Sequence, residues 1–244
     1  MVSGRQFRES LHRPLPNAPV QKSCRQVPAF TVQALQRGTC TLPPPTCNPY
    51  QEIPYTKKRI FKTSYDRGEL PISADANKTS VIWKVNLNKI DYIHYLPVFF
   101  EGLVENEEPY VFIAQQGISD LLNNGGHKIF PCIPQLILPM KRALNTRNKE
   151  VMMRALKILQ HLVKSFDMIG EALVPYYRQL LPPLNLFKEK NVNSGDDIDY
   201  SQVKGINLAD IINETLEQLE LHGGEDAFIN IKYLLPTYES CVMN

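Results

Sequence analysis

The sequence repeats itself with a period of about 44 residues, and this repeat restricts the fold more than any other feature. Aligning the chain with itself at an offset of 44 brings like residues together. The coincident pairs are Gly126 with Gly170, Pro131 with Pro175, Gln135 with Gln179, Leu136 with Leu180, Ile137 with Leu181 and Pro139 with Pro183. An offset of 54 continues the match into 224–236, and the ten extra residues correspond to a polar insertion between Lys188 and Lys204.

The repeated unit is an amphipathic helix, a glycine stop, and a second helix that ends in two apolar residues and a proline. Its period lies within the range of roughly 40–47 residues that is typical of HEAT and armadillo repeats. One such helix pair cannot bury its own apolar face, so successive pairs must stack on one another. We therefore predict an all-α fold over 57–244, an armadillo/HEAT-like α-solenoid of a few helix pairs. An irregular helical bundle with chance internal similarity is the alternative.

Hydrophobic periodicity places four helices in this region. The first spans 89–104, with a kink expected at Pro97. The second spans 107–123 and stops at the glycine pair after it. The third spans 148–166 and the fourth 208–221. These helices supply the apolar faces that the stack must bury.

The two later helices differ in their polar faces. The third carries a single polar stripe, formed by Glu150, Arg154, Lys157, His161 and Lys164. Its wide apolar arc is typical of a helix packed between layers. The fourth has a narrow apolar stripe, and its acidic residues fall elsewhere: Asp210, Glu214, Glu217 and Glu220. We expect the last helix pair to cap the stack with a polar outer face.

Two short strands are expected ahead of the helices, at Leu70–Ile72 and at Val81–Leu87, where apolar residues alternate. Turn-forming residues at 75–78 separate them and predict a β-hairpin. An isolated hairpin is only marginally stable in water. It must therefore pack on the helical body or pair with another chain.

Residues 1–56 contain nine of the nineteen prolines, including Pro43-Pro44-Pro45, and show no sustained apolar period. This composition predicts an extended, disordered arm with polyproline character, which either orders on a partner or is a passive tail.

The five cysteines are odd in number and scattered, which favours reduced thiols over a disulfide framework: Cys24, Cys40, Cys47, Cys132 and Cys241. The first 30 residues lack a secretory apolar segment, and no apolar run reaches the roughly 18 residues of a membrane helix, so we expect a cytoplasmic protein.

The net charge of +2 conceals an uneven distribution. Residues 1–68 hold eleven Lys and Arg against three Asp and Glu, whereas residues 188–244 hold four Lys against eleven Asp and Glu. A basic arm of this kind favours an acidic partner, and nucleic acid, anionic lipid and the acidic tubulin surface all qualify. The helical body is not basic and carries no RRM or zinc-finger signature, which argues against nucleic acid. The arm has too many prolines for the basic amphipathic helix that membrane binding requires.

No catalytic, cofactor-binding or metal-binding motif is present in the sequence. His127 and Cys132 are close enough to suggest a base and a nucleophile, but a surface histidine and a core cysteine are the favoured interpretation. The acidic run 193–199 suggests calcium, yet an EF-hand loop that starts at Asp197 would place Leu208 at position twelve, where a glutamate is needed. A solvated acidic loop, which can still serve as a contact, is favoured.

Three groups of residues are candidates for protein binding. The segment that leads into the body is basic and carries interspersed aromatic residues, Trp83 is the only tryptophan, and the polar insertion is acidic. Tryptophan is enriched at binding hot spots, although in a hairpin it more often packs on its own body. The candidates are Lys57, Lys58, Arg59, Lys62, Arg67, Trp83, Lys84, Asp196, Asp197, Asp199 and Tyr200.

Several longer segments resemble the parkin co-regulated protein family. They are Ile82-Trp83-Lys84-Val85, Asp91-Tyr92 through His94-Tyr95-Leu96-Pro97, Val174-Pro175-Tyr176-Tyr177-Arg178-Gln179, Asn193-Ser194-Gly195-Asp196 with Ile198-Asp199-Tyr200-Ser201-Gln202, and Ile229-Asn230-Ile231-Lys232-Tyr233 through Pro236-Thr237-Tyr238-Glu239-Ser240-Cys241. The resemblance covers roughly 57–244, and residues 1–56 resemble nothing that we can place.

This resemblance implies an armadillo-like fold, residence in the axoneme of cilia and flagella, and no enzymatic activity. Proteins of this family lie at the inner junction of doublet microtubules, where the B-tubule closes onto the A-tubule. There they touch tubulin, alternate with a small β-rich protein and meet other axonemal proteins. The resemblance also implies links to sperm-tail assembly and to parkin. We thus expect a static cross-linker, and the alternative is a soluble helical-repeat adaptor for a regulatory protein or peptide, with Trp83 as its anchor.

Overall fold

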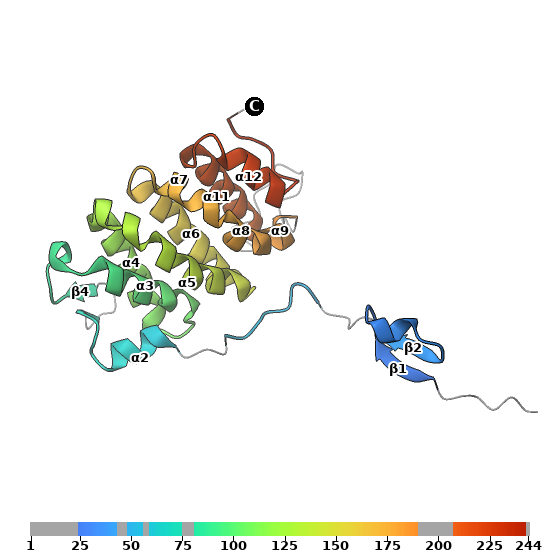
Figure 1. The fold of residues 1–244 in the computed structure, drawn as a ribbon. Coiled ribbons are helices and arrows are strands. Elements are labelled where there is room, and N and C mark those ends of the chain that lie inside the picture. The colour runs from blue at the N-terminus through green and yellow to red at the C-terminus, as the bar shows by residue number, and fades with distance from the viewer. Residues whose placement is uncertain (1–23, 43–47, 56–58, 75–80, 190–206, 243–244) are drawn as a thin grey trace, which may run out of the picture. The chain divides into compact units, whose positions relative to one another are not determined.

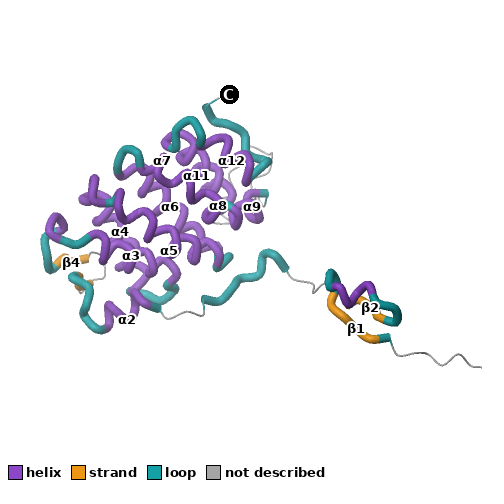
Figure 2. The backbone as a smooth tube through the Cα atoms, in the orientation of Figure 1, coloured by secondary structure: helices purple, strands orange, loops and turns teal. Residues whose placement is uncertain are grey.

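The computed structural model describes residues 24–42, 48–55, 59–74, 81–189 and 207–242 (Figures 1 and 2). The chain divides into two compact units, Met1–Asn48 and Pro49–Asn244. The second unit, called the body below, contains all the α-helices of the described residues. None of these helices is both long and apolar enough to cross a membrane.

The described part of the first unit is a small folded element. Strand β1 (Arg25–Pro28) pairs in parallel with β2 (Thr39–Leu42), and the 3-10 helix η2 (Val32–Leu35) lies in the connection between them. A disulfide joins Cys24 to Cys40, whose Cα atoms are 5.7 Å apart.

Two expectations for 1–56 are therefore wrong at these residues. The segment 24–42 is not an extended arm, and Cys24 and Cys40 are not free thiols. The pairing could not be read from sequence because only the parallel strand register brings the two cysteines together. Cys132 and Cys241 are free, as expected, and Cys47 lies outside the described residues.

The body begins at Pro49, earlier than the expected boundary at 56/57. Several contacts attach this leading segment, among them a hydrogen bond that Asn148 Nδ2 donates to Glu52 Oε2 at 3.3 Å. The Ile53 amide donates to the Thr146 carbonyl at 2.8 Å, the Tyr55 hydroxyl donates to Glu101, and the Tyr50 ring packs edge-on against Phe187. The segment follows the surface of the body, where the predicted arm would have been free.

The hairpin is confirmed, with a shorter second strand than expected. After α2 (Ile60–Asp66), strand β3 (Ile72–Ala74) pairs antiparallel with β4 (Val81–Trp83), and Ile72 lies opposite Trp83. The 3-10 helix η3 (Leu87–Lys89) follows where the strand was predicted to continue. The turn predicted at 75–78 lies outside the described residues.

The remaining described elements are helical, and the all-α class is confirmed. They are α3 (Tyr92–Glu101), η4 (Gly102–Val104), α4 (Tyr110–Gly125), η5 (Gly126–Lys128), η6 (Phe130–Cys132), α5 (Ile133–Asn145), α6 (Lys149–Ser165), α7 (Ile169–Leu173), η7 (Val174–Tyr176), α8 (Tyr177–Leu180), α9 (Pro182–Lys188), α11 (Leu208–His222) and α12 (Ala227–Leu234).

Local sequence explains where the long helices begin and end. Asn148 caps α6, because its side-chain oxygen accepts from the amides of Glu150 and Val151. Asn207 caps α11 in the same way. Gly126 follows α4 at a φ of 50°, a conformation that glycine adopts without a Cβ clash.

The helices form two layers (Figure 1). In one layer α6 lies between α4 and α11 and contacts both, while in the other α8 contacts α5 and α12. One continuous apolar core runs from Phe61 to Tyr238. In the helix pair that begins with α6, the second helix is divided into α7, η7, α8 and α9. Prolines lie at the starts of η7 and α9. The order of helices agrees with a short stack, and the armadillo-like superhelix itself stays a prediction.

The expected polar cap is only partly present. Glu214 and Glu217 of α11 are exposed, as predicted, but Glu220 is buried. Its carboxylate accepts from the Tyr238 hydroxyl (2.6 Å), the Cys241 amide (3.0 Å) and the Ser240 hydroxyl. These bonds fasten the segment after α12 onto α11. The acidic pattern of α11 therefore has a structural member that sequence alone assigned to the solvent face.

Candidate functional site

The basic residues ahead of the body bind carboxylates of the same chain. Arg59 Nη1 and Lys62 Nζ donate to the Glu107 carboxylate at 2.8 and 2.6 Å. Arg59 Nη1 also lies 3.3 Å from the buried Glu105 carboxylate as an ion pair. Burial raises the pKa of Glu105, and the Arg59 charge acts against that shift. These cations hold α2 against the start of α4.

The other predicted contacts in this region have mixed outcomes. Arg67 is exposed and lies 3.6 Å from Glu69. Lys84 is exposed beside the hairpin. Lys57, Lys58, Asp196, Asp197, Asp199 and Tyr200, together with the acidic run considered for calcium, lie outside the described residues.

Trp83 packs on its own body. Its indole Nε1 donates to Asp120 Oδ2 at 2.8 Å, and its ring lies 5.7 Å from the Phe99 ring, centroid to centroid. Asp120 also accepts from Gln116. The hairpin is thereby fastened to α4, and most of the polar and apolar capacity of the tryptophan is used inside the chain.

His127 and Cys132 do not form a catalytic pair. His127 is exposed, whereas Cys132 is buried and its thiol donates to the Lys128 carbonyl at 3.3 Å. Burial raises the pKa of Cys132 to about 11. The thiol is therefore protonated at neutral pH and behaves as a core residue.

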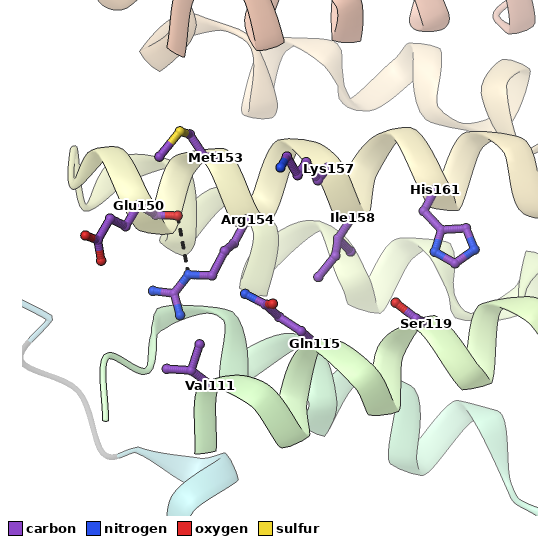
Figure 3. Close-up of a pocket in the computed structure, with 9 residues that line it drawn as sticks. All are labelled: Val111, Gln115, Ser119, Glu150, Met153, Arg154, Lys157, Ile158 and His161. Atoms are coloured by element: carbon purple, nitrogen blue, oxygen red, sulfur yellow. Dashed lines mark hydrogen bonds between the residues drawn. The ribbon is translucent and has the colours of Figure 1, made fainter. Parts of the chain in front are cut away.

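A surface groove lies between α4 and α6, with a volume of about 510 Å³ (Figure 3). Helix spacing creates its two walls, because residues three or four apart share one helix face. The α4 wall is neutral and the α6 wall carries most of the charge. The lining residues are Val111, Gln115 and Ser119 from α4, and Glu150, Met153, Arg154, Lys157, Ile158 and His161 from α6.

Arg154 closes one end of the groove. In Figure 3 its side chain extends from α6 towards Val111, and its Nε donates to the Glu150 carbonyl at 3.3 Å. A second bond runs from Nη2 to Asn106 Oδ1 at 3.0 Å. Burial lowers the pKa of Arg154, but a guanidinium remains charged at neutral pH.

His161 joins the two walls further along. Its Nε2 lies 2.8 Å from Asn123 Oδ1 of α4, and burial lowers the pKa of the imidazole. The ring is therefore mostly neutral at pH 7. In Figure 3 it points towards Ser119, but within the described residues no hydrogen bond joins the two side chains. A nucleophile and base pair is not assembled here.

Lys157 and Lys164 are exposed on α6, and neither forms an ion pair within the described part of the chain. Glu150 is the single carboxylate of the groove lining. Lys157 thus lines the groove, and Lys164 continues the same polar stripe of α6 beyond the lining, both without an ion-pair partner in the described residues. Such an arrangement attracts an acidic surface.

The α6 stripe was visible in the sequence, but it was not recognised as part of a site. Its spacing marks one face of a helix, and only the packing of α4 beside α6 supplies the second wall. Across the described ranges, no group of three His, Cys, Asp or Glu is placed to hold a metal ion.

The chain matches a family model described as "Parkin co-regulated protein" over residues 59–240. It is also similar to the mouse (Mus musculus) protein named "Parkin coregulated gene protein homolog". The two are 54% identical over 217 residues, which cover 88% of this chain and 90% of the mouse protein.

This coverage corrects one expectation from the sequence. An aligned stretch of 217 residues is longer than 57–244, so the similarity must reach into residues 1–56, which we could not place. Together, the family match and the mouse relative cover most of the body and part of the first unit. The chain belongs to the Parkin co-regulated protein family.

Proposed function

We propose that this protein is a structural, non-enzymatic component of ciliary and flagellar axonemes. In this role it cross-links the A- and B-tubules at the inner junction of doublet microtubules by binding tubulin and a small β-rich partner. The observation that carries the proposal is the polar stripe of α6, where Lys157 at the groove and Lys164 beyond its lining are exposed and have no carboxylate partner in the described residues. The tubulin surface is acidic and complements these charges.

The electrostatics favour a reversible but oriented contact. Exposed cations without internal partners attract an acidic surface over roughly the Debye length, about 8 Å at physiological salt. Each contact of this kind is weak, but repetition along a microtubule multiplies affinity by a factor on the order of 10²–10⁴ where geometry permits simultaneous engagement. The continuous core suits such a role, because it keeps the binding surfaces at fixed separations.

Co-sedimentation with taxol-stabilised microtubules tests the tubulin contact. The double variant Lys157→Glu with Lys164→Glu should need about tenfold more tubulin for half-maximal pelleting, because four units of charge change at the contact. Added salt should weaken the wild-type protein and have less effect on the variant.

The matched control reverses two other lysines, Lys89 in η3 and Lys141 in α5, which form no ion pair in the described ranges. This control should pellet like the wild type. Equal pelleting of the groove variant and the wild type would contradict the proposed contact.

The cellular part of the proposal has a separate test. A tagged copy should decorate axonemes along their length and stay bound through detergent extraction. A signal confined to the soluble fraction would instead favour the adaptor function. Trp83 is a weaker anchor for that adaptor than the sequence suggested, because Asp120 and Phe99 already engage it.

A further inference from the structure

The last helix pair of the body, α11 and α12, leaves large apolar side chains exposed. Of all such residues in the described body, the five most exposed are Met168, Leu221, Ile229, Tyr233 and Val242. All five come after α6 in the sequence, and all but Met168, which precedes α7, belong to the last helix pair, α11 and α12, or to the segment that follows it. A helical stack normally presents a polar face at its end, because no further repeat covers it. This end follows that rule only in part.

Two of these residues form one wall of a hollow. Ile229 and Tyr233 lie one turn apart on α12, and their side chains are 67% and 74% exposed. Val174 and Pro175 of η7 and the exposed Arg178 of α8 line the same hollow, whose volume is about 520 Å³. Side chains four apart on a helix share a face, so the isoleucine and the tyrosine present a single apolar strip.

A second hollow adjoins the first and supplies negative charge. It has a volume of about 500 Å³ and again includes Val174 and Pro175. Three carboxylates line it, and within the described residues none of them forms an ion pair. They are Glu171, Glu225 and Asp226. We call the two hollows together the end surface.

We propose that the end surface docks a segment of a partner protein in which lysine or arginine side chains lie beside large apolar ones. The partner's apolar side chains would cover Ile229 and Tyr233, and its cations would face the three carboxylates. Tyrosine is enriched among residues that dominate binding energy, and exposed apolar strips on soluble proteins mark interaction sites. Unpaired carboxylates beside the strip add orientation and select against acidic partners.

This inference goes beyond the proposed tubulin contact and does not depend on it. The groove between α4 and α6 has a net positive charge, whereas the end surface has a net negative charge, with three carboxylates against Arg178, and is built from other elements of the stack. A cross-linker requires two surfaces with different partners. Opposite charge is the simplest way to keep those partners apart.

The binding experiment uses the full chain and a fluorescein-labelled amphipathic helix made of leucine and lysine as the probe. Fluorescence anisotropy gives its dissociation constant. Two double variants remove different parts of the surface, Ile229→Ser with Tyr233→Ser and Glu225→Lys with Asp226→Lys. Each should weaken binding on the order of tenfold.

The control variant removes exposed apolar side chains at the opposite end of the body, by Ile82→Ser with Ile93→Ser. It should bind the probe like the wild type. A second probe, in which every lysine is replaced by glutamate, should bind the wild type at least tenfold more weakly. Circular dichroism checks that all variants keep their helix content.

Three outcomes would overturn the proposal. The first is unchanged affinity in both end-surface variants. The second is equal affinity for the lysine and glutamate probes. The third is self-association of the wild type in sedimentation velocity that Ile229→Ser with Tyr233→Ser abolishes, since the surface would then be covered by a second copy of this chain. A loss of microtubule pelleting by the groove variant leaves this result unaffected, so the two proposals are tested separately.

Discussion

The groove and the end surface belong to the same helical stack, and each of the two hollows of the end surface has a volume similar to that of the groove, but the two surfaces differ in chemistry. In the groove the apolar floor is covered, with Ile158 only 6% exposed, and the charge comes from cations of α6. On the end surface Ile229 and Tyr233 are exposed, and the net charge comes from three carboxylates against the single cation Arg178. Position in the stack explains much of the difference.

An inner helix such as α6 has neighbours on both sides, because it lies between α4 and α11. Its apolar arc is covered and only the polar stripe reaches solvent. The final helix, α12, has no following layer, so part of its apolar circumference stays exposed. Inner helix pairs of such a stack are therefore suited to electrostatic contacts, and terminal helix pairs to contacts that also bury apolar area.

The largest expected effect is a loss of stability in the last helix pair, while the region around the groove keeps its stability. Glu220→Ala removes the carboxylate that accepts from Tyr238, Ser240 and Cys241, of which the Tyr238 and Ser240 hydroxyls are buried. We expect a loss of about 2–6 kcal/mol of unfolding free energy, at about 1–3 kcal/mol for each of the two buried hydroxyls that lose this acceptor. Chemical denaturation measures the total.

Hydrogen exchange locates this loss. Protection should fall in α11, α12 and the segment after them, and should be kept in α4. Uniform loss of protection across the body would contradict the assignment of Glu220 to the last layer.

A smaller effect is expected where α7 approaches α11. A Cβ added at Gly170 would collide with the carbonyl oxygen of His222. Gly170→Ala should therefore cost about 1–3 kcal/mol, the usual range for overpacking. Ala172→Gly in the same helix is a control for helix propensity. Thermal unfolding that ranks the control below Gly170→Ala would contradict the close approach.

Acid should affect the two regions at different pH. Burial lowers the pKa of His161 below its usual 6.5, so the native groove resists protonation. Its contribution to stability is complete above pH 6.5 and is lost as pH falls from there towards the lowered pKa. We expect wild type to lose more stability than His161→Gln between pH 7.5 and 5, by less than about 1 kcal/mol, the scale of one hydrogen bond.

The end layer should respond at lower pH. Burial raises the pKa of Glu220, but hydrogen bonds from Ser240, Tyr238 and Cys241 outweigh burial and leave its pKa below the usual 4.5. Its stabilisation is present above pH 4.5 and is lost as pH falls through the lowered value. Hydrogen exchange should thus show α4 and α6 loosening before α11 and α12. If all four helices lost protection at the same pH, the two regions would not differ in their response to acid.

The smallest effects concern stability in the charge variants. Lys157→Glu with Lys164→Glu, and Glu225→Lys with Asp226→Lys, change exposed groups that have no ion-pair partner in the described residues. Each pair should shift the unfolding free energy by no more than about 0.5 kcal/mol per site. Denaturant titration would expose a larger shift, which would mean that these residues support the fold and are not free for binding.

Much of the fold was predictable because its signals are local. Helix periodicity and the glycine stops placed α3, α4, α6 and α11 within a few residues of their observed bounds. The hairpin followed from alternating apolar residues around Trp83. These patterns depend on residues close in sequence, and a single chain displays them without an alignment.

The candidate sites were harder to predict because they depend on distant pairings. The Trp83 bond to Asp120 and the Arg59 and Lys62 contacts with Glu107 link residues that lie far apart in sequence. Before those partners are known, a basic or aromatic residue looks free. For the α6 stripe, the sequence showed the lysines on one polar helix face, but it did not show the α4 wall that completes the groove.

The contact between Gly170 and His222 also has a mechanical consequence. Without a side chain at residue 170, the α7 backbone rests directly on the end of α11, and the Tyr177 hydroxyl adds a bond to the Leu219 carbonyl at 3.0 Å. A pull on α11 is therefore transmitted to α7 through main-chain atoms, with no flexible side chain to absorb it. In the axonemal role proposed above, this joint would make the last helix pair move as one piece with the pair before it each time the filament bends.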